Sequence, residues 1–125
     1  MESSLIVSST EKGIEFFTEI LKADGFQQIA TIGTGGETRR ILLEKDFDLV
    51  IINTPLRDET GENLSRHIAS KGVSQVILVV KSEYYDAVSA ACEHDGVMTI
   101  AKPVNKAVFW SALKLCKSAH NRLKR

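Results

Sequence analysis

The chain has 125 residues, of which 43% are hydrophobic and 26% are charged. This length predicts one domain with a buried core and excludes a separate catalytic or substrate domain, and the composition excludes a disordered or low-complexity chain. No apolar run approaches the roughly 20 residues of a membrane-spanning helix, and the first residues lack the pattern of a signal peptide. We therefore expect a cytoplasmic protein that makes no membrane contact.

The formal net charge is zero, but its distribution is uneven. Seven of the 16 basic residues and no acidic residue lie between Lys102 and the last residue, so the preceding part carries 16 acidic against nine basic residues. This pattern has two interpretations. The basic end is either a surface for a partner or a solvated helix face whose cations lie favourably near the helix C-terminus.

The hydrophobic pattern predicts strands and helices in strict alternation. Short apolar runs predict strands at residues 5–7, 28–32, 48–53, 75–80 and 97–101, and helical spacing predicts helices at 11–24, 37–45, 62–70, 83–93 and 105–125. Gly25 is typical of a residue that ends a helix, Pro55 follows the third strand, and Ser82 is expected to cap the fourth helix.

Alternation of this kind predicts right-handed crossovers and a parallel sheet covered by helices on both faces. The expected fold class is therefore α/β: a flavodoxin-like (βα)5 three-layer sandwich, with the strand order 2-1-3-4-5, formed by residues 1–125 as one domain. In this fold the ligand crevice lies beyond the C-terminal ends of strands one and three. Here that position is occupied by Ser8, Ser9, Thr10 and residues 53–57.

Several landmarks occur in a characteristic order. Leu5-Ile6-Val7 precedes a polar pair, the strand at 48–53 is followed by Gly61 eight residues after Asn53, and Lys102-Pro103 follows the last strand. This set resembles the receiver domain of bacterial two-component response regulators, the CheY-like domains, over roughly residues 4–119. The resemblance implies a phosphorylation pocket of an acidic pair that holds magnesium, a phosphoacceptor aspartate, a threonine or serine, and a lysine.

Most of these family residues are replaced here. By the same landmarks, the acidic pair falls on Ser8 and Ser9, the phosphoacceptor on Asn53, the hydroxyl position on Val80, the lysine on Lys102, and the aromatic switch position on Thr99. Magnesium requires carboxylate oxygens, which two serines and an asparagine do not supply. A carboxamide is also a poor nucleophile, so we expect neither a metal site nor an acyl phosphate.

The role of Lys102 stays open between two interpretations. Its amine either bonds the Asn53 carbonyl and nearby backbone oxygens or, with Ser8 and Ser9, forms a weak site for a small anion. Asp58 and Glu59 are expected to lie in a solvated loop rather than to act as metal ligands or an acid/base pair.

No pattern predicts a catalytic residue or a cofactor. The glycine loop at 33–36 matches no nucleotide-binding motif, and the three histidines are dispersed over separate helical segments, none of them beside a serine or cysteine in a strand-to-helix turn. The two cysteines, Cys92 and Cys116, are expected to be buried reduced thiols.

The last predicted helix has a seven-residue apolar repeat. Phe109, Ala112, Cys116, Ala119 and Leu123 are spaced by three and four residues. The first half is expected to lie on the sheet, but by Leu123 the helix spans about 27 Å, longer than a strand of five residues. We therefore expect the helix to project from the domain and to begin a coiled coil. This continuation resembles the ANTAR class of antiterminators, in which RNA would bind only to a C-terminal domain absent here.

These observations predict a non-enzymatic signalling module that regulates transcription through a further output domain. The family resemblance implies a homodimer or a protein partner bound through the fourth helix, fifth strand and fifth helix. The residues expected at that interface are Tyr84, Tyr85, Val88, Phe109, Cys116 and Leu123, although both tyrosines also fit partly buried helix positions. The alternative is a ligand-sensing domain that binds a small anion in the crevice.

Overall fold

The computed structural model describes residues 1–123, with side chains described through Arg122. The elements, in chain order, are β1 Ser3–Ser8, α1 Glu11–Ala23, β2 Gln28–Ile32, α2 Gly35–Glu44, β3 Leu49–Asn53, α3 Gly61–Ser70, β4 Gln75–Val80, α4 Ser82–Cys92, β5 Val97–Ala101 and α5 Lys106–Leu123. None of the described helices is both long and apolar enough to cross a membrane.

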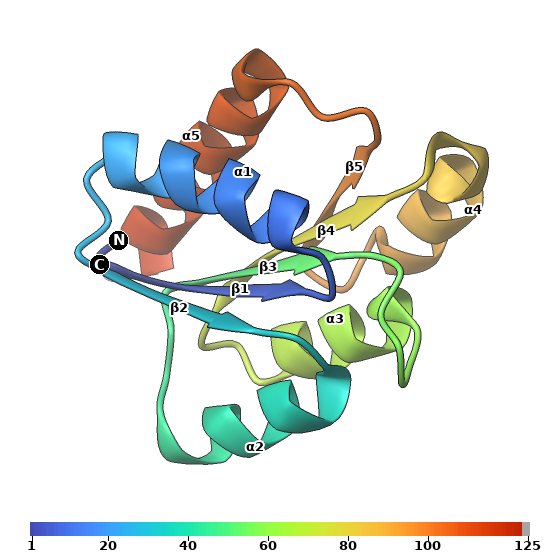
Figure 1. Cartoon of the computed structure of the whole chain (residues 1–125), viewed down its shortest axis with the longest axis horizontal. Coiled ribbons are helices and arrows are strands. Elements are labelled where there is room, and N and C mark those ends of the chain that lie inside the picture. The colour runs from blue at the N-terminus through green and yellow to red at the C-terminus, as the bar shows by residue number, and fades with distance from the viewer. Residues whose placement is uncertain (124–125) are drawn as a thin grey trace.

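The five strands form one parallel sheet in the order β2-β1-β3-β4-β5, which confirms the predicted fold class and strand order. Helices α1 and α5 cover one face, and α2 and α3 cover the other (Figure 1). Helix α4 completes the second layer, since Cys92 belongs to the same hydrophobic cluster as Leu64 and Ile68 of α3.

Strand β3 lies at the centre of the sheet and has no solvent-exposed face. Val50 and Ile52 belong to the cluster under α3, whereas Ile51 belongs to the cluster under α1 and α5. Successive side chains of a strand point to opposite faces, so a strand covered on both sides needs an uninterrupted apolar run. The sequence of β3 meets this requirement and fixes where the strand ends, at Asn53.

Threonine side chains set the starts of the first three helices. Thr10, Thr34 and Thr60 each accept a hydrogen bond from the backbone amide three residues later, at 3.2 Å. The cap at Thr34 starts α2 at Gly35, two residues before the predicted start. The expectation that Ser82 caps α4 is wrong, because Ser82 is the first helical residue and no side chain caps this helix.

The described part of α5 packs against the domain. Its side chains at Phe109 and Cys116 are 0% and 3% exposed and belong to the core beneath α1 and α5. Near the end of the helix His120 is still buried, with its Nε2 3.9 Å from Asp48 Oδ1. The predicted projection is therefore not seen as far as His120, and the predicted contact of Leu123 lies outside the described side chains.

Candidate functional site

The parallel register brings four strand ends to one edge of the sheet. Ser8 of β1 pairs with Asn53 of β3, Asn53 pairs with Val79 of β4, and Val80 pairs with Ala101 of β5. Lys102 follows β5 directly, and its backbone amide donates to the Val80 carbonyl at 2.8 Å. This edge is where the sequence predicts a ligand crevice.

Ser8 and Asn53 form a buried polar pair at the base of the crevice. The Asn53 Nδ2 donates to Ser8 Oγ at 3.1 Å, and Ser8 Oγ donates to the Thr10 carbonyl at 3.1 Å. The first turn of α1 lies directly over this pair at Gly13. A Cβ at that position would be 2.6 Å from Ser8 Oγ and closer still to Asn53 Nδ2, so only glycine fits there without displacement.

Lys102 reaches the crevice but bonds a backbone oxygen. Its Nζ donates to the Thr54 carbonyl at 2.5 Å. Thr54 is itself held by Val79, whose carbonyl accepts from the Thr54 amide at 3.1 Å and from its Oγ1 at 2.7 Å. Burial, reinforced by nearby Lys81, lowers the pKa of the Lys102 amine.

The remaining family positions contribute little to the crevice. Ser9 is partly exposed, and its Oγ donates to the Pro55 carbonyl at 3.2 Å. Val80 is buried in the cluster under α3, and Thr99 is half-buried on β5. The structure therefore brings Ser8, Asn53 and Lys102 to one place but not the side chains of Val80 and Thr99.

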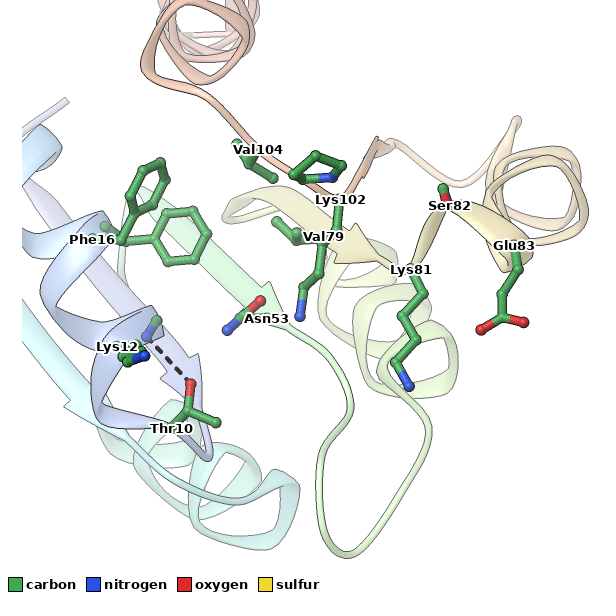
Figure 2. A pocket seen from close by; sticks show the side chains of 13 residues that line it. Thr10, Lys12, Phe16, Asn53, Val79, Lys81, Ser82, Glu83, Lys102 and Val104 are labelled. Atoms are coloured by element: carbon green, nitrogen blue, oxygen red, sulfur yellow. Dashed lines mark hydrogen bonds between the residues drawn. The ribbon is translucent and has the colours of Figure 1, made fainter.

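A cavity of about 610 Å³ opens beside Asn53 and Lys102. Figure 2 shows Lys12 and Lys81 on opposite sides of these two residues, and both lysines line the cavity. Sequence reasoning missed Lys12 and Lys81, although a signal existed. Lys81 directly follows a strand whose end belongs to the same sheet edge, and Lys12 lies in the first turn of the helix that follows β1.

Asp58 and Glu59 do not form the freely solvated loop that the sequence predicts. The Asp58 carboxylate, although exposed, accepts from the amides of Gly35 and Gly36 at 2.9 Å each, and these bonds hold the pKa of Asp58 below its usual value. Glu59 accepts two bonds from Arg39, at 3.0 and 2.7 Å. Both carboxylates tie the loop before α3 to the start of α2.

The face formed by α4, β5 and α5 differs in detail from the predicted interface. Tyr84 is 55% exposed, whereas Tyr85 and Val88 are half-buried against the core under α3 and α4. Since Phe109 and Cys116 are core residues, their prediction as interface residues is corrected. Among the described side chains of α5, the large apolar residues that are exposed are Val108 and Leu115, each one position before Phe109 or Cys116 in the seven-residue repeat.

The comparisons with known proteins agree with this fold. The family model of the response regulator receiver domain matches residues 5–114. The chain therefore belongs to the response regulator receiver domain family, whose members are signalling modules. No curated protein sequence matches the chain significantly.

Solved structures of receiver domains share the fold. The signal receiver domain of a signal transduction histidine kinase from Syntrophus aciditrophicus is 25% identical, with 95% of this chain and 92% of that chain covered and a TM-score of 0.80. A CheY-like receiver domain from Methylobacillus flagellatus is 24% identical, with 93% and 98% covered and a TM-score of 0.77. A receiver domain protein from Clostridium thermocellum is 22% identical, with 99% and 98% covered and a TM-score of 0.81.

Proposed function

We propose that this receiver domain is a non-enzymatic, cytoplasmic signalling module that acts through protein contacts and not through phosphorylation. The observation that carries the proposal is the neutral pair of Ser8 and Asn53 at the strand ends. The family landmarks assign these two positions to a magnesium ligand and to the phosphoacceptor.

The residues present do not fit magnesium. The ion prefers several oxygen ligands that include carboxylates, in a nearly ideal octahedral arrangement. Ser8 Oγ already accepts from the Asn53 amide and donates to a backbone carbonyl, and Ser9 Oγ donates to Pro55. The first turn of α1 also closes over the pair at Gly13. Ligand charge and space both argue against a cation here.

Asn53 is also unsuited to accept a phosphoryl group. An attacking carboxylate carries a full negative charge, whereas the amide oxygen is neutral and the amide nitrogen lone pair is delocalised. The Asn53 nitrogen is, in addition, engaged as the donor to Ser8. The pair is therefore suited to hold β1 and β3 together.

The test is incubation of the chain with acetyl phosphate and magnesium, followed by intact mass. We expect no adduct of about 80 Da, the mass of one phosphoryl group. The receiver domain of DrrB, whose structure is described as beryllofluoride-activated and which is 20% identical, is the positive control. A stable adduct on this chain while the control also reacts would contradict the proposal.

Contacts would use the face of α4, β5 and α5, with a homodimer or a protein partner. Tyr84, Val108 and Leu115 support this assignment because they expose apolar surface on that face. Leu115→Glu is expected to lower an association constant measured by sedimentation, whereas Leu43→Glu, at an exposed position on α2, is the matched control. Equal losses in the two variants would remove the case for this face.

The output that we propose is transcription regulation by antitermination, through a domain following this one. The proposal is supported by the resemblance to the ANTAR class and by the basic residues of the last helix. Sedimentation and RNA binding of this chain, compared with a chain extended beyond residue 125, test it. Binding of RNA with equal affinity by both would contradict a separate RNA-binding domain.

A second candidate function is ligand sensing in the crevice. One observation favours it: the cavity beside Asn53 is lined by Lys12 and Lys81 in addition to Lys102. A thermal shift of this chain with inorganic phosphate, lost in Lys102→Ala, would support sensing.

A further inference from the structure

Lysine side chains from three segments line the cavity beside Asn53. Lys12 comes from α1, Lys81 precedes α4, and Lys102 follows β5. Of the residues that line this cavity, Glu83 alone is acidic, and it lies beyond Lys81, away from Asn53 and Lys102 (Figure 2). Three ammonium groups against one carboxylate give the cavity a net positive charge, which concentrates small anions.

The local bonding leaves this charge largely uncompensated. The described hydrogen bond of the Lys102 amine is to the neutral Thr54 carbonyl, and Lys81 repels the Lys102 charge. Ser82 and Glu83, the first two residues of α4, line the same cavity, and no side chain caps that helix. The positive end of the helix dipole therefore adds to the lysine charges.

Apart from Thr10 and Gly13, the rest of the lining is apolar. Phe16 and Phe17 of α1 contribute aromatic rings, which meet edge to face with centroids 5.1 Å apart. Val79, Pro103 and Val104 extend this wall. A volume of about 610 Å³ lies in the range of small-molecule sites, and such sites combine an apolar wall with a few polar groups.

We propose that this cavity binds, without covalent reaction, a small phosphate monoester that carries an aromatic or apolar body. The phosphate lies among the amines of Lys12, Lys81 and Lys102, and the body lies against Phe16 and Val104. A phosphate monoester carries nearly two negative charges at neutral pH and three acceptor oxygens, which suits several lysines better than one carboxylate does. This inference rests on the proposed function, because the ligand takes the place of covalent phosphorylation as the signal.

The test is calorimetric titration of the intact chain with phenyl phosphate, inorganic phosphate and phenol at constant ionic strength. We expect phenyl phosphate to bind most tightly and phenol least. Lys12→Ala and Lys81→Ala should each weaken phenyl phosphate binding by about three- to tenfold, the loss expected for one exposed charged contact. Lys114→Ala, at an exposed position of α5 outside the cavity, is the matched control and should change nothing. Val104→Ser should weaken phenyl phosphate but not inorganic phosphate.

The outcomes separate the parts of the inference. Equal affinities for phenyl phosphate and inorganic phosphate would overturn the role of the apolar wall, and equal affinities for phenyl phosphate and phenol would overturn the role of the lysines. Lack of any binding, or an effect of Lys114→Ala equal to that of Lys81→Ala, would overturn the site itself. Intact mass of the same protein after separate incubation with acetyl phosphate and magnesium distinguishes failure of the proposed function, which a covalent phosphoryl adduct would reveal, from failure of this ligand site alone.

Discussion

Gly13→Ala is the most informative single substitution in the crevice, since it adds one methyl group above the Ser8–Asn53 pair. The added carbon would lie 2.6 Å from Ser8 Oγ and 3.0 Å from Thr10 Oγ1, and closer still to Asn53 Nδ2, whereas ordinary contacts begin at 3.4 Å. Neither Ser8 nor Asn53 can easily move, because both are buried and hydrogen-bonded to each other. The methyl group must therefore displace the first turn of α1 or break the pair.

The magnitude follows from two opposing effects. Overpacking of a well-filled site costs about 1–3 kcal/mol. Alanine in place of glycine in a helix recovers up to about 1 kcal/mol. The net loss of unfolding free energy should be on the order of 1–2 kcal/mol, which lowers the urea midpoint by roughly 1 M.

Urea unfolding with Gly36→Ala as control checks this prediction. Gly36 lies in the first turn of α2, where a Cβ would be 3.3 Å from the exposed carboxylate of Asp58, so this variant should match or exceed the parent. In a Ser8→Ala/Asn53→Ala background most of the cost of Gly13→Ala should disappear, because the two closest of the three atoms are gone. A Gly13→Ala protein as stable as the parent, or one equally destabilised in both backgrounds, would refute the reasoning.

Three further predictions concern other parts of the molecule. Burial raises the pKa of Asp48, but hydrogen bonds from the backbone amides of Glu2 and Ser3, together with nearby His120, lower it by more. The net shift of this pKa is therefore downward. Because the folded-state pKa lies below the ordinary 3.8, ionised Asp48 stabilises the fold above that value, and this contribution is lost as the pH falls through the folded-state pKa. The difference in urea midpoint between pH 7 and pH 3 should therefore be smaller in Asp48→Asn than in the parent. Burial raises the pKa of Cys116 to about 11, so iodoacetamide at pH 8 should label this thiol much more slowly in the native than in the urea-unfolded chain, as followed by mass spectrometry. Arg39→Lys, which loses the two-pronged contact with Glu59, should lower the unfolding free energy by about 0.5–1 kcal/mol, and an unchanged urea midpoint would show that the pair contributes nothing.

Features set by local pattern could be predicted from the sequence. The strands at 28–32, 75–80 and 97–101 have the predicted bounds. Such bounds depend on apolar runs and on glycine or proline residues that lie within a few positions of each strand end. The alternation of elements predicts a parallel sheet, and the flavodoxin-like order expected for five strands places Ser8 beside Asn53. The proximity of Ser8 and Asn53 could thus be predicted from the strand order, without knowledge of any side-chain contact.

Features set by distant partners could not be predicted. Asp58 bonds the amides of Gly35 and Gly36 across more than 20 residues of chain, and nothing in the local sequence around Asp58 marks this contact. The seven-residue repeat of α5 predicts that its first half lies on the sheet, but it does not show which other residues of the helix are exposed. Phe109 and Cys116 face the sheet, and the exposed stripe, which includes Leu115, is offset by one residue.

Beside the neutral Ser8–Asn53 pair, Lys102 still has a structural role under the proposed function. Carboxylates gathered at adjoining strand ends would repel one another and would need a cation between them. Ser8 and Asn53 avoid that requirement, since the donor of one side chain meets the acceptor of the other. Lys102 then has no phosphorylated side chain to contact, yet its bond to the Thr54 carbonyl joins the segment after β5 to the segment after β3. The Lys102 ammonium group can thus hold the strand ends together with one N–H and still donate its other N–H groups to an anion in the cavity.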